Sequence, residues 1–372
     1  MSSGDRGFAE VALVDSGRDP LRQVRRAMEA AGWENAIPSG CEIALKPNLG
    51  WDLFLPGAVT SPLIVEGVVQ VLRDRARKIY LVEADQVLVD CETALGQTRM
   101  DRLCRRYNLE WINLSREPLR EVKVENPLHL PALRLPEILT RTVLVTVPVM
   151  KTHNKTVLSG AIKNQWGCLP TFRHNYHPVV HEVLRDLATV LPPAFCVMDA
   201  TVALEGNGPK SGIPRICNLI LASSDPVALD TVSGELMGVD HLPIRHLQLC
   251  AEAGIGVHDR ARIRVINEDR REVTDLPRFD FRLARHNTVS LVETILRGSM
   301  ARRLIFETPV LDLLCLGAKA WYLIWYYLIK GRRLRDWAIA ASPYGSQWAS
   351  TPPPSEAGDG AGEAVSSVRN KS

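Results

Sequence analysis

Residues 41–84 contain three segments that set the fold class: CEIALKPN (41–48), SPLIVEGVVQVLRDRA (61–76) and KIYLVEA (78–84). The first and third are short apolar runs, which favour strands buried in a sheet. The second has helical spacing of its apolar residues and opens with Ser61-Pro62, a typical helix start. Strands that alternate with helices predict a parallel sheet covered on both faces.

The same alternation extends to both sides of this region. Residues 8–15 predict a strand, and residues 16–33 a helix. Downstream, the pattern predicts helices at 93–107, 181–191 and 226–238, and strands at 140–150, 194–200, 216–224 and, at an edge, 262–268. We therefore expect an α/β domain over residues 1–295, with a largely parallel sheet, helices on both faces and a C-terminal amphipathic helix.

The composition excludes several classes of protein. The chain has 45 basic and 42 acidic residues, a net charge of +3, which lacks the basic excess typical of nucleic-acid binding. Its eight cysteines form no closely spaced pair of the kind that zinc sites, iron–sulfur clusters and disulfide frameworks use. The N-terminal residues lack the apolar run of a secretory signal. We expect a cytoplasmic protein with buried, reduced cysteines and no nucleic-acid partner.

Polar side chains follow several predicted strands. In open α/β sheets, ligands bind beyond the carboxyl ends of the strands. The side chains at or just past such ends are Lys46, Lys151, Asp199 and Asp225. We expect the site at this edge of the sheet.

A cluster of lysines and amides predicts binding of an anion. In residues 147–170, an apolar strand leads directly into Lys151 and His153, and a stretch of small residues then reaches Lys163 and Asn164. Such donors attract carboxylate or phosphate oxygens. In the segment Lys46-Pro47-Asn48, proline holds the chain extended, so that the lysine and the asparagine face a common rim. A solvated basic loop is the alternative for either segment.

Two further segments supply carboxylates. In residues 199–212, Asp199 and Glu205 flank a glycine-rich loop that contains Asn207, and the alternative is a flexible turn. In residues 223–230, Asp225 precedes Pro226 as a helix cap, whereas Asp230 lies about one turn farther on, where capping does not explain it. Any of these carboxylates, or His153, is a candidate general acid, general base or metal ligand.

Three histidines, at 174, 177 and 181, have spacings that a helix would bring to one face. Pro178 interrupts that helix, so a metal site is the weaker interpretation. Whether a metal is bound remains open at this stage.

Five of these segments, in this order, resemble the family called domain of unknown function 362. They are Lys46-Pro47-Asn48, Val149–His153, Ala161–Asn164, Glu205–Pro209 and Ser223–Asp230, and the resemblance spans about residues 40–255. Many relatives carry a fused ferredoxin-like segment, which implies redox work. This chain lacks the C-x-x-C-x-x-C array, so no fused iron–sulfur cluster is expected, and the cofactor is unknown. Met150 stands where the family usually has lysine.

Residues 310–330 form an apolar, aromatic segment inside a predicted helical region, 300–340. Lys319 at its centre would cost roughly 2.5–3.5 kcal/mol in a membrane-spanning helix. An interfacial helix fits better, with its aromatic residues at the headgroup level and a basic flank that suits anionic lipid over residues 304–335. Packing on the sheet or on a second subunit is the alternative. Residues 342–372 are rich in Pro, Gly and Ser and predict a disordered tail.

The leading hypothesis is an enzyme that binds an anionic small molecule and catalyses either an oxidation–reduction or a group transfer. Lys46, Lys151 and Lys163 would hold the anion, while Asn48, Asn164 and Asn207 would orient the substrate. One alternative is a non-catalytic metabolite- or cofactor-binding protein docked on a membrane. Another is a redox protein that receives electrons from a separate ferredoxin.

Overall fold

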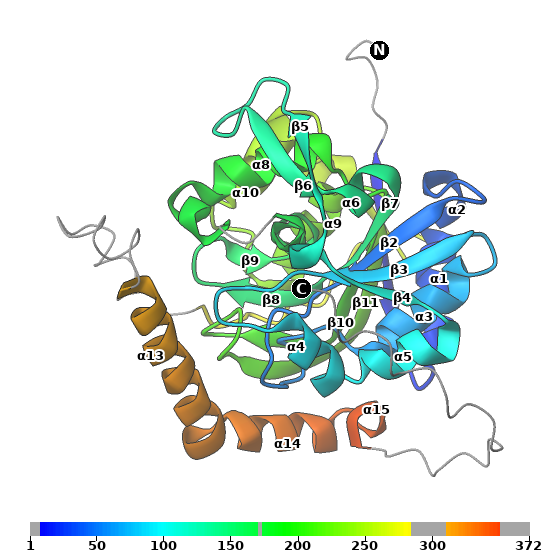
Figure 1. Ribbon diagram of the computed structural model, residues 1–372. Helices are drawn as coiled ribbons and strands as arrows, with labels where there is room; N and C mark the ends of the chain where they lie inside the picture. Colours follow the sequence, from blue (N-terminus) through cyan, green and yellow to red (C-terminus); the bar gives the residue numbers. More distant parts are fainter. Residues whose placement is uncertain (1–7, 170–172, 284–309, 350–372) are drawn as a thin grey trace, which may run out of the picture.

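A largely parallel sheet forms the centre of the computed structural model, which describes residues 8–169, 173–283 and 310–349 (Figure 1). Its strands are, in spatial order, β12 (Ile263–Ile266), β1 (Ala9–Asp15), β11 (Ile213–Ser223), β10 (Phe195–Glu205), β7 (Val143–Val147), β2 (Glu42–Pro47), β3 (Lys78–Glu83) and β4 (Glu110–Asn113). From β10 to β4 all neighbours are parallel, whereas β11 is antiparallel to both β1 and β10.

The strand expected at 140–150 is two strands. β7 ends at Val147, and β8 (Val149–His153) continues beyond Pro148 along β10, with β9 (Val157–Ser159) returning antiparallel to it. Proline has no N–H to donate to a ladder, so the pairing changes at this residue. The shift carries Lys151 out beyond the end of β7.

Helices cover both faces of the sheet, which confirms the predicted fold class. Alternate residues of β2 show the arrangement: Ala44 packs into one apolar cluster, and Ile43 and Leu45 pack into the other. The first cluster includes side chains of α7 (Ala161–Asn164), α8 (Val180–Val190), α9 (Pro226–Met237) and α10 (Arg245–Glu252). The second includes side chains of α1 (Pro20–Ala30), α2 (Trp33–Ala36), α3 (Pro62–Leu72), α4 (Cys91–Gln97) and α5 (Met100–Tyr107).

The helix expected at 93–107 is divided into α4 and α5. Arg99 has a φ of 63°, a left-handed conformation that ends one helix and begins the other. The edge strand expected at 262–268 is confirmed, because β12 pairs with β1 in parallel. A small hairpin of β5 (Leu119–Lys123) and β6 (Ala132–Pro136) leads into α6 (Glu137–Arg141).

The C-terminal residues form an arm that runs along the outside of the domain (Figure 1). It contains α13 (Val310–Ile324), a π-helical turn (Trp325–Ile329), α14 (Gly331–Ala341) and α15 (Ser346–Ala349). Trp325 and Tyr326 are buried against Trp51, and the Tyr326 hydroxyl donates to the Phe54 carbonyl at 2.6 Å. The single helix expected over 310–330 therefore ends in a tight turn that is packed on the domain.

The tail expected to be disordered from residue 342 is partly folded. Trp348 is buried beside Phe54, with ring centroids 5.6 Å apart, and the Tyr344 hydroxyl donates to the Gly17 carbonyl at 2.9 Å. The two aromatic rings supply the apolar burial that the small and polar residues around them lack. Residues 350–372, the rest of this prediction, and residues 284–309 lie outside the described part. Within that part, no helix has the length and apolar character needed to cross a membrane.

Candidate functional site

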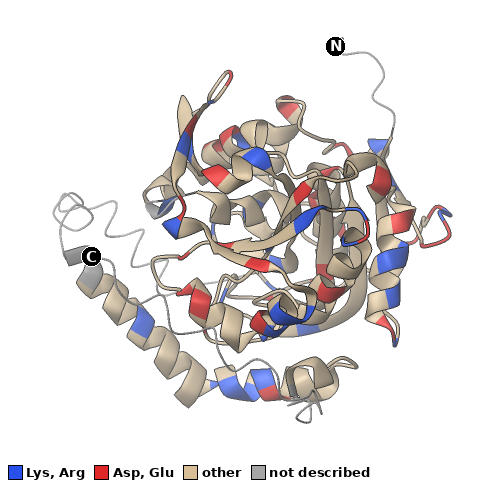
Figure 2. Cartoon of the chain, turned by 45° about the vertical axis from the view of Figure 1, so that its right-hand side comes forward, with Lys and Arg blue, Asp and Glu red and all other residues tan. Residues whose placement is uncertain are grey.

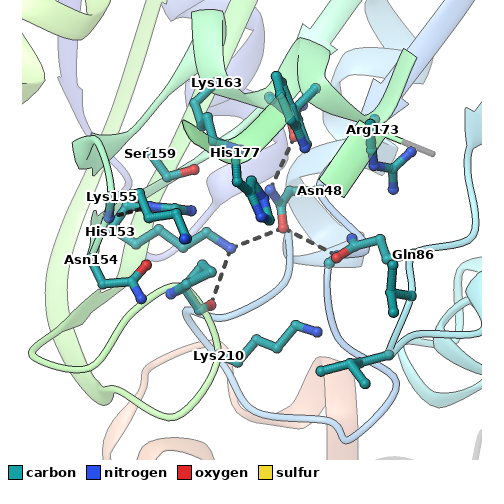
Figure 3. Close-up of a pocket in the computed structure, with 18 of the residues that line it drawn as sticks. Asn48, Gln86, His153, Asn154, Lys155, Ser159, Lys163, Arg173, His177 and Lys210 are labelled. Carbon is teal, nitrogen blue, oxygen red and sulfur yellow. Dashed lines mark hydrogen bonds between the residues drawn. The ribbon is translucent and has the colours of Figure 1, made fainter. Parts of the chain in front are cut away.

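A cavity of about 220 Å³ opens beyond the carboxyl ends of β2, β3 and β8 (Figure 3). Strands β2, β3, β8 and β9, the helix α7, the 3-10 helix Arg173–Val179 and the loops between these elements supply its polar lining. The residues are Lys46, Asn48, Glu83, Gln86, Lys151, His153, Asn154, Lys155, Ser159, Lys163, Asn164, Arg173, His177 and Lys210. Six of the predicted site residues thus lie together: Lys46, Asn48, Lys151, His153, Lys163 and Asn164. The position at the strand ends agrees with the sequence prediction.

Glu83 holds Lys46 at the base of the cavity. The two buried side chains form an ion pair at 2.8 Å, and Glu83 also accepts from the backbone amides of Leu49 and Ala84. A Cβ atom on Gly167 would lie 2.3 Å from the Glu83 carboxylate and 2.6 Å from the Lys46 ammonium. The glycine therefore lets the backbone close over the pair, and the charge of Lys46 is already compensated.

Lys151 is held by neutral acceptors. Its ammonium donates to Asn48 Oδ1 at 3.0 Å, to the Ala58 carbonyl at 2.7 Å and to the Pro209 carbonyl at 3.5 Å. Asn48 donates in turn to Asn164 Oδ1 at 3.0 Å. The two amides therefore orient the lysine, in addition to any contact they make with a ligand.

Lys163 lies against aromatic rings. Its ammonium is 4.9 Å from the centroid of Trp166, and this ring stacks on His177 at 5.7 Å with an interplanar angle of 8°. Arg173 donates to the carbonyls of Leu169 and Asp85 at 3.0 and 2.9 Å, which fixes the start of the segment that carries His177.

Positive charge exceeds negative charge in the lining, because Glu83 is its one carboxylate among the described residues. Burial, then the cations Lys210 and Lys46, lower the pKa of Lys151 to about 7. Burial and then Arg173, Lys151, Lys46 and Lys155 lower the pKa of Lys163 to about 7 as well. Burial also lowers the pKa of Lys210, to about 8, and holds the pKa of His153 well below its ordinary value. A bound anion would oppose each of these shifts.

Two predicted catalytic carboxylates lie outside the cavity and bind backbone amides. Asp225 caps α9 by accepting from Val227 and Ala228 at 2.9 and 2.8 Å. Asp230 is fully buried and accepts from the amides of Ala161 and Ile162 at 2.6 and 3.0 Å, at the start of α7. Asp230 thus positions the helix that carries Lys163, which accounts for the aspartate that capping of α9 left unexplained.

The other carboxylates and one amide also lie apart from the lining. Asp199 accepts from the Ser61 amide at 2.7 Å and from Thr201, and burial raises the pKa of its carboxyl. Glu205 lies 3.6 Å from Arg215 and 3.8 Å from Arg282. Asn207 belongs to a loop that contributes Pro209 and Lys210 to the cavity but not Asn207 itself. The geometry therefore gives Asp199 and Glu205 structural partners.

The histidines predicted as metal ligands have other neighbours. His177 stacks on Trp166, whereas His181 packs against His246 at 5.7 Å between centroids. The His174 side chain lies outside the described part of the chain. Among the described residues, no group of three or more His, Cys, Asp or Glu side chains is placed to hold a metal.

Several lining residues were missed from the sequence. Glu83 lies at the end of a predicted apolar strand, and Lys46 lies at the end of another. An acid at such a position was a signal that Glu83 could belong to the site. Lys210 follows the loop glycines, so its place in a predicted flexible loop was a second signal. Arg173 and Gln86 lie in irregular segments, where no pattern in the sequence marks them.

The comparisons with known proteins agree with the resemblance drawn from the motifs. A sequence profile of the family called domain of unknown function (DUF362) matches residues 43–235, more than half of the chain. The chain belongs to the DUF362 family. The profile covers the strand ends that carry Lys46 and Lys151, the helix α7 with Lys163, and Asp230, so the cavity is built largely from the family's own segment.

Two further similarities were found for this DUF362 chain. A thylakoid-associated protein of Synechocystis sp. is 26% identical over 257 residues, which cover 65% of this chain and 76% of the relative. A crystal structure of a protein from Thermotoga maritima has a TM-score of 0.37 at 11% identity. That match covers 62% of this chain and 59% of the other, so the chain spans less than two thirds of the solved protein.

Proposed function

We propose that the cavity is the substrate site of an enzyme that acts on a small carboxylate or phosphate compound. The observation that carries this proposal is the uncompensated positive charge in a buried space. The one carboxylate in the described lining, Glu83, is paired with Lys46, whereas Lys151, Lys163, Arg173 and Lys210 face the cavity with no carboxylate in the lining left for them.

The energetic cost of this arrangement favours a ligand. Bringing like charges together out of water is unfavourable, and the lowered pKa values of Lys151 and Lys163 express that cost. An anion would recover it through charge-assisted hydrogen bonds. The volume of about 220 Å³ suits a small molecule, and the neutral side chains Asn48, Asn164 and Ser159 add hydrogen-bonding groups that fix its orientation.

Anion binding is tested by calorimetry and thermal denaturation with phosphate, sulfate, glyoxylate and citrate. We expect Lys163→Ala and Lys151→Ala to abolish the stabilisation that the best of these anions gives. Lys123→Ala, which removes an exposed lysine of the β5–β6 hairpin, is the matched control and should bind as the unaltered protein does. Equal affinity in all four proteins would refute the proposal.

A second proposal concerns the arm: its outer side docks on an anionic membrane surface. Large apolar side chains are exposed there, with exposed fractions between 40 and 78%: Leu313, Leu316, Trp321, Leu323, Ile324, Tyr327, Leu328, Ile329 and Trp337. Basic residues gather where α14 begins, at Arg332, Arg333 and Arg335, next to the largely uncharged α13 (Figure 2). An apolar face beside a basic flank is complementary to anionic lipid, and the name of the Synechocystis relative supports this proposal.

Only part of the predicted lipid-facing surface supports the docking proposal. Tyr322, Trp325 and Tyr326 are buried on the domain and therefore face inward, and the half-exposed Lys319 lies 3.9 Å from Asp52. Residues 304–309 lie outside the described part. The proposed surface is therefore the opposite side of α13, together with Tyr327 and Leu328 of the turn.

Membrane docking is tested by sedimentation with vesicles of phosphatidylserine and phosphatidylcholine. We expect the protein to sediment with these vesicles, more weakly at high salt, and Leu316→Asp with Leu328→Asp to abolish sedimentation. Leu128→Asp, a substitution at an exposed leucine near the β5–β6 hairpin, is the matched control. The proposal would be overturned if the double variant sediments with vesicles as the unaltered protein does, or if the substitutions disrupt a dimer of the protein and leave vesicle binding unchanged.

A further inference from the structure

The lysines that line the cavity differ in what their ammonium groups contact. Lys46 has Glu83, and Lys151 has three oxygen acceptors. Lys210 is attracted by Asp52. Lys163, in contrast, meets no hydrogen-bond acceptor among the described residues, and the face of Trp166 is its contact. Its side chain is 8% exposed and lines the cavity.

The surroundings of Lys163 favour a neutral amine. The nearby charges are the cations Arg173, Lys151, Lys46 and Lys155, and together with burial they lower its pKa to about 7. An ordinary lysine is unprotonated in about one molecule per 1,000 near pH 7.4, whereas the lowered pKa of Lys163 leaves its amine unprotonated in a far larger fraction of molecules. A buried primary amine with an available lone pair is a nucleophile toward carbonyl carbon.

We propose that Lys163 is a catalytic nucleophile that forms an imine with a small oxo acid, a compound in which a carbonyl carbon stands next to a carboxylate. This inference rests on the proposed anion site, because the neighbouring cations would hold the carboxylate while the carbonyl meets the amine. The same chemistry extends to carbonyl compounds that carry a phosphate in place of the carboxylate.

The step balances without an oxidant or a reductant. The Lys163 nitrogen attacks the carbonyl carbon, a C–N bond forms, and the C=O π pair moves to oxygen, which takes the proton that nitrogen loses. A second proton converts the new hydroxyl to water, the C–O bond breaks and an iminium remains. His153 accepts from the Lys155 amide at Nδ1, at 3.1 Å, so in its neutral form Nε2 carries the proton of the ring. It lines the same cavity, where the Nε2–H can donate a hydrogen bond to the substrate oxygen, while the second proton comes from solvent.

The backbone around Lys163 is fixed, which such a step requires. Asp230 holds the first amides of α7, and a Cβ atom on Gly160 would lie 2.0 Å from its carboxylate. One residue after Lys163, the side-chain Nδ2 of Asn164 donates to Thr146 Oγ1 at 2.7 Å. Together with the face of Trp166, these contacts restrict where the amine can lie. Figure 3 shows Lys163 on the side of the cavity that also holds Ser159, His153 and Lys155.

Reductive trapping tests the inference. The full-length protein is incubated with glyoxylate and sodium cyanoborohydride near pH 7.4, and the modified lysines are located by peptide mass spectrometry. We expect Lys163 to be modified at least about tenfold faster than the exposed Lys123, because far more of it is unprotonated. Excess phosphate should slow the modification of Lys163 alone. Acetaldehyde, which has the carbonyl but no carboxylate, should show much less preference for Lys163.

The controls separate this inference from the proposed anion site. Lys163→Arg keeps a cation and should keep phosphate binding while losing the adduct at this position. If phosphate stabilises the protein but Lys163 reacts no faster than Lys123, or Lys151 is trapped first, the nucleophile inference is wrong and the anion site stands. If no anion binds and no selective adduct forms, both are wrong.

Discussion

Lys151 and Lys163 of the cavity and Asp230 of α9 are all buried, but they differ in what surrounds them. Asp225 and Asp230 accept hydrogen bonds from backbone amides, so their charges serve the fold. Lys151 and Lys163 lie among other cations, beside an open volume. The comparison teaches that burial of a charge, or its place at a strand end, does not indicate a ligand site. The gathering of several like charges around one open volume does, since burial also raises the pKa of Asp230 to about 7.

Among the substitutions that test this comparison, Glu83→Gln is expected to change the free energy of unfolding most. It keeps the shape but removes the partner of the buried Lys46, which should lower the free energy of unfolding by about 3 kcal/mol. Because the cavity becomes more positive, phosphate should bind more tightly and restore part of the loss. Urea denaturation with and without phosphate measures both effects. Weaker phosphate binding in this variant would contradict the electrostatic account.

Asp230→Asn is the counterpart on the structural side. One carboxylate oxygen that accepts from a buried amide of α7 is replaced by a donor, which should cost about 2 kcal/mol of the free energy of unfolding. The loss of unfolding free energy, measured by urea denaturation, should be the same with and without phosphate, unless the Lys163 side chain moves when α7 loses this contact. A loss that phosphate fully reverses would place Asp230 in the ligand site.

The pH dependence of stability separates the two regions further. Lys151 and Lys163 have a pKa of about 7 in the folded protein, below the value of 10.5 for an ordinary lysine. The unfolded chain therefore binds more protons between these values, and stability should rise with pH, by about 1.5 kcal/mol per lysine from pH 7 to about 8.5. Urea denaturation midpoints measured between pH 7 and about 8.5 test this predicted rise in stability. Lys163→Met should show a smaller rise, and a flat profile in the unaltered protein would contradict the account.

The smallest expected effect concerns the arm. Tyr326→Phe removes the hydroxyl that donates to the Phe54 carbonyl and should cost about 1 kcal/mol of the free energy of unfolding. Phosphate affinity should not change, since Tyr326 does not line the cavity. Tyr327→Phe alters an exposed neighbouring hydroxyl and is the control for the urea measurement. Equal stability of the two variants would mean that the arm contributes little to the fold through this contact.

The sequence predicted the layers of the fold well, because apolar periodicity is a local property. It also brought Lys46 and Lys151 to one edge of the sheet, since strand ends meet there, but it placed Asp199 and Asp225 at the same edge and neither lines the cavity. It failed where a residue's role depends on a distant partner. Asp230 looked catalytic because its partners, the amides of α7, lie about seventy positions earlier in the chain, and no local pattern shows that pairing.

The same limit explains the arm. The pattern of residues 310–330 predicts a surface helix, but which side faces the domain depends on the position of Trp51, more than two hundred residues earlier. Tyr322, Trp325 and Tyr326 therefore turned out to be buried, although they were expected at a lipid interface. Arg173 shows the extreme case, in which an irregular segment places a buried cation in the cavity without any periodic signal.

The most direct test of the central claim is calorimetric titration with sulfate and acetate at pH 7.5 in two buffers of different ionisation enthalpy, because these anions carry no reactive carbonyl and do not change protonation near this pH. The account predicts saturable binding with net uptake of protons, because an anion raises the lowered pKa values of Lys151 and Lys163. Both the binding and the uptake should fall in Lys163→Ala and persist in Lys123→Ala. Binding without proton uptake, or no binding of any of the small anions, would contradict an uncompensated cationic site.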